Sequence, residues 1–239
     1  MAYDPGNRWT ARSAAVSEVE VDVGLRQFML RVYNYMAGGL ALTGVVAYAA
    51  VTTGVYQAIY GSILFWVVLL APLALVMLLS FRIQSMSLGA AQATFWGYAA
   101  LMGLSLAGIF LVYTGASVAR VFFITAATFA AMSLYGYTTR TDLSRFGSFL
   151  FMGLIGVIIA GVVNMFILSS ALQFALSVAG VVVFVGLTAW DTQMIKEMYY
   201  EGDGALVAGK KAIMGALKLY LDFINLFVLL MQLLGNRRD

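Results

Sequence analysis

The chain has 239 residues, of which 62% are hydrophobic and 10% are charged, and its formal net charge is +3. Soluble domains have about 45–50% apolar and about 25% charged residues, so this composition is typical of an integral membrane protein. The sequence holds no cysteine and no histidine, which excludes disulfides, thiolate or imidazole metal sites, and a cysteine or serine–histidine catalytic centre.

Residues 1–27 are polar and carry charges of both signs, including Arg8, Arg12, Glu18 and Asp22. Acidic residues of this kind are not typical of a cleaved signal peptide. We therefore predict a cytosolic N-terminal tail over residues 1–27, partly disordered and becoming helical toward residues 27–35. The remaining domain, residues 28–239, is predicted to lie in the membrane.

Seven apolar segments follow, each long enough to cross about 30 Å of hydrocarbon as a helix. Long runs of Leu, Val, Ala and Phe and only two prolines favour helices over the short alternating strands of a β-barrel. We therefore predict an all-α integral membrane protein with seven transmembrane helices. The predicted spans are Met36–Thr53, Ser62–Phe81, Phe95–Tyr113, Val118–Thr138, Phe149–Leu168, Phe174–Ile195 and Ile213–Leu234.

The loops between these spans alternate between charged and uncharged. Basic residues follow the second, fourth and sixth spans, whereas the loops 54–61 and 169–173 carry no charge. The positive-inside rule then places the charged loops and the N-terminus in the cytosol. Seven spans would leave the C-terminus outside, where Arg237 and Arg238 are a mild exception. This exception leaves open whether the seventh segment is re-entrant.

The segment Ala216–Gly235 is apolar enough to span a bilayer, yet it carries Asp222, with Lys218 and Asn225 at helical spacing on the same face. A carboxylate at the bilayer centre costs about 2.5–3.5 kcal/mol on insertion scales, so it needs a partner inside the protein. We therefore expect the last helix to occupy the centre of the bundle.

Asp191 is the second acidic residue within the predicted spans, and it forms a polar face with Thr188 and Thr192. Asp191 lies about 6 Å and Asp222 about 14 Å from the cytosolic ends of their helices, at 1.5 Å of rise per residue. Because the sixth and seventh spans run in opposite directions, we expect the two carboxyl groups to face each other.

The segments LTAWDTQMIKEMYY and GALKLYLDFINLFVLLMQLLG resemble the C-terminal blocks of the Bax inhibitor-1 family. The resemblance implies a seven-helix bundle that encloses its last helix, and a pH-sensitive calcium leak, with suppression of cell death in eukaryotes. The family's paired aspartates correspond to Asp191 and Asp222, and a basic residue that latches the pair corresponds to Arg82. Calcium would be a permeant ion held transiently by Asp191 and Asp222, with no cofactor.

The chain departs from the family in one respect, because no acidic residue lies between Asp22 and Asp142. Any further carboxyl group that relatives contribute from the first three spans is therefore missing. Calcium prefers six to eight oxygen ligands. Two carboxylates with Thr188, Thr192 and Asn225 would coordinate it incompletely, which suits transient passage of the ion rather than tight binding. Two close carboxylates are expected to share one proton at acidic pH and to repel each other once both are ionised. The sequence therefore predicts an ion leak that closes when the carboxyl pair is protonated.

Other interpretations remain open at this stage. The aspartate pair could have a purely structural role and hold two helices together. Arg82 could extend its charged group to the membrane interface without contacting the pair. Lys218 could do the same or pair with Asp222. An intramembrane aspartyl protease and a retinal protein are disfavoured, because the expected YD and GxGD blocks and a deep lysine are missing. The principal alternative is a non-conducting regulator that binds a membrane protease or a stress complex.

No phosphate-binding glycine loop, nucleic-acid-binding pattern or cofactor fingerprint is present, so we expect no enzyme activity and no nucleic acid partner. The expected surroundings are a lipid bilayer, with calcium or other cations as partners, in a bacterial inner membrane. Glycines within the spans, among them Gly103, Gly153, Gly156 and Gly161, are interpreted as positions where helices pack closely.

Overall fold

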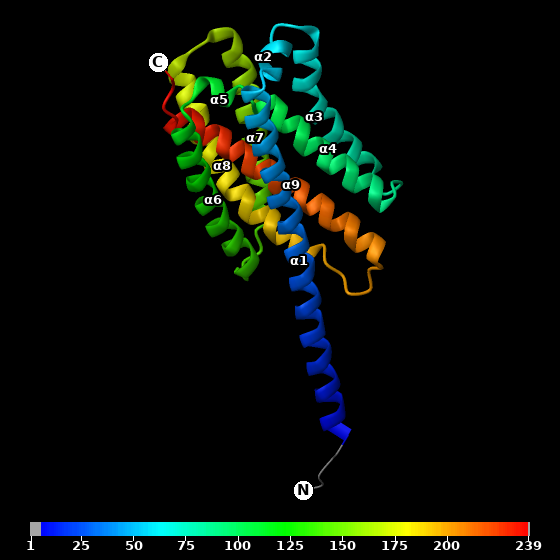
Figure 1. Cartoon of the computed structure of the whole chain (residues 1–239). Helices are drawn as coiled ribbons and strands as arrows, with labels where there is room; N and C mark the ends of the chain where they lie inside the picture. Colours follow the sequence, from blue (N-terminus) through cyan, green and yellow to red (C-terminus); the bar gives the residue numbers. More distant parts are fainter. Residues whose placement is uncertain (1–5, 239) are drawn as a thin grey trace.

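A computed structural model describes the backbone of residues 6–238 and the side chains of residues 23–238. This part of the chain forms nine α-helices and no strand, apart from one isolated bridge between Tyr113 and Arg237 (Figure 1). Seven of the helices are long and apolar enough to cross a membrane, which confirms the predicted fold class. The helices are α1 (Gly6–Thr52), α2 (Val55–Ile59), α3 (Ile63–Arg82), α4 (Leu88–Leu106), α5 (Ile109–Val112), α6 (Gly115–Thr138), α7 (Ser144–Ile167), α8 (Ser170–Glu197) and α9 (Ala205–Leu234).

The first helix is longer than predicted. Helix α1 begins at Gly6 and extends away from the bundle (Figure 1), so residues 6–27 are helical where a partly disordered tail was expected. The spanning portion of this helix is Val23–Thr52. Residues 1–5 of the predicted tail lie outside the described residues, and its cytosolic location stays a prediction.

Several later helices begin before the apolar windows that predicted them, and the predicted span Phe95–Tyr113 is divided after Leu106 between α4 and α5. Helix α9 begins at Ala205, eight residues before the predicted Ile213. The charged loop before it is therefore only residues 198–204, and Lys210 and Lys211 belong to the helix. A hydropathy pattern marks only the residues at membrane depth, whereas a helix continues as long as its backbone hydrogen bonds can form.

Polar residues fix several helix starts. Side-chain oxygens of Ser87, Thr114 and Ser169 accept hydrogen bonds from backbone amides three residues later, at the N-termini of α4, α6 and α8. These residues are the N-caps that helix starts prefer, because they satisfy amides without a partner inside the helix. The turns on either side of α2 use Gly54 and Gly61 with positive φ, a conformation that glycine adopts without a steric penalty.

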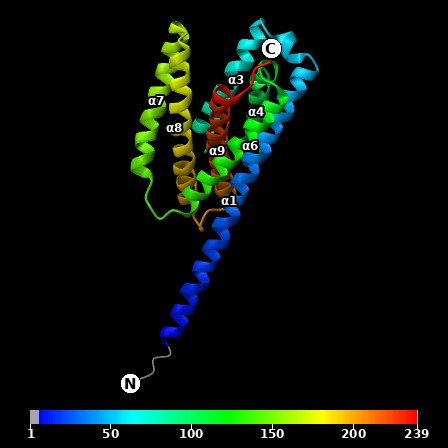
Figure 2. The same ribbon diagram turned by 90° about the vertical axis from the view of Figure 1, so that its left-hand side faces the viewer.

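The last helix is the most buried of the spans. In α9, 67% of the membrane window is buried, against 11–33% in the other six spans. It packs against α1, α3, α4, α6 and α8, and in Figure 2 it runs between α8 and α4. A central position for this helix stays a prediction, which this burial supports.

The C-terminus lies at the opposite end of the bundle from the N-terminus (Figure 1). Helix α9 is uninterrupted over 30 residues, about 45 Å at 1.5 Å per residue, so the seventh segment does not turn back as a re-entrant loop. Beyond it, the amide of Arg238 donates to the Val112 carbonyl at 2.9 Å, and the amide of Asn236 donates to the Ser117 hydroxyl at 2.9 Å. These bonds hold the end of the chain against the connection between α5 and α6.

Candidate functional site

Asp191 of α8 and Asp222 of α9 come together inside the bundle. The two helices pack along each other in opposite directions, and the side chains of Asp191 and Asp222 lie within hydrogen-bonding reach. The residues are only 9% and 4% exposed. Within the described residues, the Asp222 Oδ2 atom is buried without a hydrogen-bond partner. The small difference in depth inferred from the sequence is thus closed by side-chain contact.

Lys218 is paired with Asp191. Its Nζ lies 3.2 Å from Asp191 Oδ1 and 5.8 Å from the centre of the Trp190 ring. Pairing with Asp222, one turn along the same helix, was an expectation from spacing, and the ion pair instead crosses to α8. The physical reason is depth, because Lys218 and Asp191 both lie nearer the charged end of their antiparallel helices than Asp222 does.

Thr188, Thr192 and Asn225 bond mainly to their own helices. Thr188 donates to the Phe184 carbonyl at 2.8 Å, Thr192 to the Thr188 carbonyl at 2.7 Å, and Asn225 to the Leu221 carbonyl at 2.8 Å. Among residues 23–238, no hydrogen bond joins these three side chains to either carboxyl group. Their support for the aspartate pair, as distinct from helix structure, remains a prediction.

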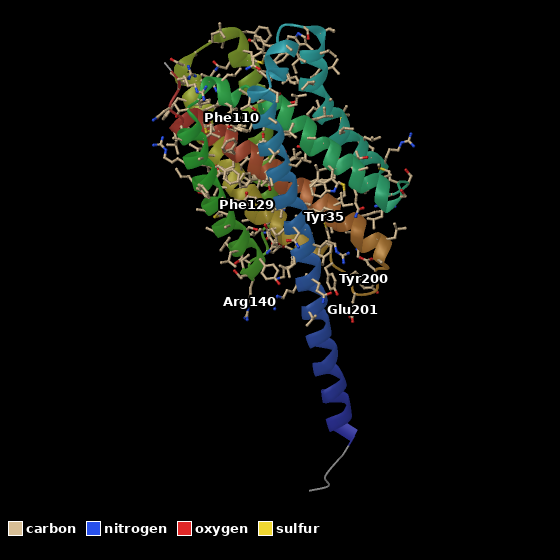
Figure 3. All side chains as sticks on the ribbon, viewed as in Figure 1. Tyr35, Phe110, Phe129, Arg140, Tyr200 and Glu201 are labelled. Atoms are coloured by element: carbon tan, nitrogen blue, oxygen red, sulfur yellow. The ribbon has the colours of Figure 1, made fainter. Side chains whose placement is uncertain are left out.

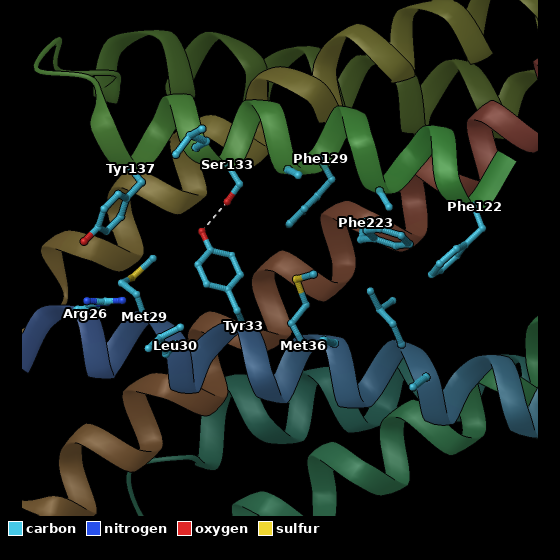
Figure 4. Close-up of a pocket in the computed structure, with 16 residues that line it drawn as sticks. Arg26, Met29, Leu30, Tyr33, Met36, Phe122, Phe129, Ser133, Tyr137 and Phe223 are labelled. Atoms are coloured by element: carbon cyan, nitrogen blue, oxygen red, sulfur yellow. Dashed lines mark hydrogen bonds between the residues drawn. The ribbon is translucent and has the colours of Figure 1, made fainter. Parts of the chain in front are cut away.

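A second polar connection, missed in the sequence, reaches α8 from α1. The Tyr33 hydroxyl lies 2.5 Å from Ser133 Oγ on α6 (Figure 4), and Ser133 Oγ lies 2.9 Å from Thr192 Oγ1. Thr192 was expected to lie on a polar face, but nothing in the spacing of Tyr33 and Ser133 could have linked them to it before the fold was known.

Arg82 lies at the C-terminal end of α3 and is exposed. Within the part of the chain whose side chains are described, it forms no ion pair or hydrogen bond with Asp191 or Asp222. Its latch role therefore stays a prediction. Lys210, which the sequence suggested to be a loop residue, is 9% exposed and donates to the Gln84 carbonyl at 2.8 Å, so it joins α9 to the turn after α3.

The polar face of α9 continues to its other end. The Gln232 Oε1 atom accepts hydrogen bonds from Gln173 at 2.9 Å and from Ser177 at 2.8 Å, both at the start of α8. The two helices are thus joined by polar contacts at both ends of their packed length. Gln232 makes the contact at one end, and Lys218 with the aspartate pair makes the contact toward the other.

A metal site of the usual kind is not formed in the part of the chain that the structure describes, since no group of three or more acidic residues comes together there. The aspartate pair supplies two carboxyl groups, fewer oxygens than the six to eight that calcium prefers. Asp142, in the connection between α6 and α7, lies outside the spans. Hydrogen bonds from the Ser144 side chain and backbone amide lower the pKa of the Asp142 carboxyl, so that residue is ionised at mildly acidic pH.

These features define a polytopic integral membrane protein with a carboxyl pair buried between its last two helices. Comparison with known families identifies it further, because residues 25–239 match the family described as "Inhibitor of apoptosis-promoting Bax1". The chain belongs to this family, the Bax inhibitor-1 family, as the C-terminal blocks predicted.

The chain resembles several bacterial proteins. The chain is 52% identical over 219 residues to protein RP147 of Rickettsia prowazekii, covering 91% of this chain and 93% of the relative. It is 49% identical over 226 residues to "Inner membrane protein YbhL" of Escherichia coli, covering 93% and 97%. A Caulobacter vibrioides protein is 45% identical over 247 residues, covering 98% of each chain.

Proposed function

We propose that this protein is a calcium or cation leak channel whose gate is the Asp191–Asp222 pair. The observation that carries the proposal is the contact between two nearly inaccessible carboxyl groups within the membrane-spanning bundle. Intramembrane carboxylates are costly and characteristically mark ion or proton pathways. A purely structural contact between helices could be made by uncharged side chains at lower cost.

The gate follows from the charge on this pair. At acidic pH the two carboxyl groups share a proton, which bridges α8 and α9 and removes negative charge that a cation would need. At higher pH both groups ionise and repel each other, which favours separation of the helices and entry of a cation. Lys218 supplies a positive charge beside this pair, since its ammonium group lies 3.2 Å from Asp191 Oδ1.

The aspartate pair would bind the permeating ion only transiently. Two carboxylates offer too few oxygens for tight calcium binding, so the remaining coordination would come from water, which suits a leak. We infer that α9, as the most buried span, is the core helix of the bundle and carries Asp222 along the ion path. No enzymatic activity is proposed, and neither the family description nor the names of the relatives contain one.

We further infer that the protein lies in a bacterial inner membrane with its N-terminus in the cytosol. The location is supported by the name of the Escherichia coli relative. The orientation is supported by the basic residues at the ends of the helices, which follow the positive-inside rule.

Calcium flux into liposomes that contain the purified protein tests the proposal, measured from about pH 5 to about pH 8. The wild-type flux is expected to rise with pH. Asp191→Asn and Asp222→Asn are each expected to abolish the pH dependence and to lower the flux at about pH 8 by roughly tenfold or more, because one mobile proton and one negative charge are removed.

Asp142→Asn is the matched control, since the same substitution is made at an ionised aspartate outside the spans. It is expected to leave the pH profile unchanged. Unaltered flux and pH dependence in Asp222→Asn would contradict the proposal, provided that all variants elute as folded protein in detergent.

A non-conducting regulator is the second candidate, favoured by one observation. The N-terminal part of α1 extends beyond the bundle (Figures 1 and 2), which gives a partner a helix to bind outside the membrane. Absence of flux at every pH would favour a role in restraining a membrane protease or a stress complex. Deletion of residues 1–20 would then abolish the cellular phenotype, whereas the double substitution of Asp191 and Asp222 would leave it intact.

A further inference from the structure

A lateral groove separates α1 from α6 along the membrane-spanning part of the protein (Figure 4). Phe223 of α9 forms part of its lining, and the hydrogen bond between Tyr33 and Ser133 joins the two flanking helices. The cavity has a volume of about 800 Å³. The groove is independent of the aspartate pair, because neither Asp191 nor Asp222 lines it.

The lining of this groove is apolar over most of its length. Met29, Leu30, Met36, Phe122, Phe129 and Leu134 are among the side chains that form it. Tyr33 and Ser133 are polar, but each satisfies the other through their shared hydrogen bond. A surface of this chemistry at membrane depth suits hydrocarbon.

One end of the groove is cationic. Arg26 and Tyr137 lie together there (Figure 4), and the Lys196 ammonium lies 5.3 Å from the centre of the Tyr137 ring. Among residues 23–238, no carboxylate forms an ion pair with Arg26. Arginine presents a planar fork of donors that matches phosphate oxygens, so this end is complementary to a phosphate group.

The length of the groove matches one leaflet. From Arg26 to Ala41 along α1 is about 22 Å at 1.5 Å per residue, against about 15 Å for half of the hydrocarbon thickness. The extra length reaches the headgroup region at the Arg26 end. A second cavity, of about 510 Å³, continues toward the other leaflet and shares Leu40, Ala41, Phe122 and Phe223 with the first.

The volume distinguishes two possible occupants. A partner helix about 10 Å across would occupy on the order of 1,700 Å³ over a length of about 22 Å, more than the cavity offers. The volume that a hydrocarbon needs can be taken from benzene, which binds in an apolar cavity of about 150 Å³, or about 25 Å³ per carbon. At this ratio, a cavity of about 800 Å³ accepts on the order of 30 carbons. This is the size of the acyl chains of one phospholipid.

We propose that the groove between α1 and α6 binds one anionic glycerophospholipid from the leaflet at the Arg26 end. Its acyl chains lie along the apolar lining that includes Met29 of α1 and Phe129 of α6, and its phosphate contacts the Arg26 guanidinium. The second cavity is left for lipid of the opposite leaflet.

Native mass spectrometry of the full-length protein in detergent tests this site, with phosphatidylglycerol and phosphatidylcholine as the added lipids. Wild type is expected to bind one phosphatidylglycerol more tightly than phosphatidylcholine. Arg26→Gln is expected to weaken that binding roughly fivefold, which corresponds to one basic residue at a membrane surface. Arg31→Gln is the control on the same helix, because Arg31 is exposed and does not line this groove.

A second pair of variants tests the hydrocarbon part of the site. Ala130→Trp fills the groove from α6 and is expected to abolish tight binding, and Ala37→Trp does the same from α1. Ala127→Trp is the control, since Ala127 is exposed on α6 and does not line the groove. Equal binding of the two lipids with no effect of Arg26→Gln would overturn the proposal. Equal loss in Ala130→Trp and Ala127→Trp would also overturn it.

Discussion

Lys218 balances the charge of the buried carboxyl pair. Its ammonium group contacts Asp191 and lies over Trp190, and its side chain is 36% exposed. That exposure screens the ion pair, so its energetic effect is smaller than that of a fully buried pair. The position still matters, because Lys218 gives Asp191 a cationic partner, while Asp222 has no cation in hydrogen-bonding contact among the described residues.

Lys218→Met is therefore expected to move the midpoint of the flux profile toward higher pH, because removing the nearby cation makes two negative charges on the pair less favourable. The flux assay in liposomes measures the midpoint. Lys196→Met is the control, since Lys196 contacts the Tyr137 carbonyl and ring and not an acid. A midpoint that moves to lower pH in Lys218→Met would contradict the assigned charge balance.

Close packing of α6 on α8 depends on one glycine. A Cβ atom at Gly136 would lie 2.1 Å from the Ala189 carbonyl oxygen, two residues before Asp191. Backbone cannot move aside as a flexible side chain can, so the two helices approach this closely only with glycine at that position. The close-packing interpretation also holds for Gly103, where a Cβ atom would lie 2.5 Å from the Thr43 carbonyl oxygen, and less tightly for Gly153, where it would lie 3.3 Å from a Val183 methyl group. It is wrong for Gly156 and Gly161, which have no neighbour within 4 Å.

Gly136→Ala is accordingly expected to destabilise the protein by about 1–3 kcal/mol, the usual cost of overpacking. Thermal unfolding in detergent measures this loss. Gly156→Ala, which adds the same methyl group without a neighbour, is expected to be neutral or stabilising by up to about 1 kcal/mol through helix propensity. Equal stability of the two variants would show that α6 and α8 are farther apart.

The two ends of the bundle are expected to lie on opposite sides of the membrane. Arg140 and Glu201 lie at the same end of the bundle as the emerging N-terminal part of α1 (Figure 3), whereas α2 and the C-terminus lie at the other (Figure 1). Because the chain has no cysteine, one introduced thiol can report the side on which each end lies.

In intact bacterial cells, a membrane-impermeant maleimide is expected to label Gln57→Cys in α2 at once. Glu201→Cys, in the connection between α8 and α9, is expected to react only after the membrane is permeabilised. Both positions are exposed, so accessibility within the protein does not limit labelling. The reverse pattern would invert the proposed orientation and place the N-terminus outside.

The sequence alone determined the class of protein, the number of spans and the family, because apolar length and the C-terminal motif are local properties of the chain. It also indicated that Asp191 and Asp222 are buried acidic residues, since a carboxylate in an apolar span is costly and needs a partner inside the protein. Only the tertiary structure decided that Lys218 pairs with Asp191, that Tyr33 meets Ser133, and that α1 and α6 leave a groove. Those contacts depend on how each helix is rotated and how closely it packs, and an almost uniformly apolar helix gives no periodic pattern to fix either.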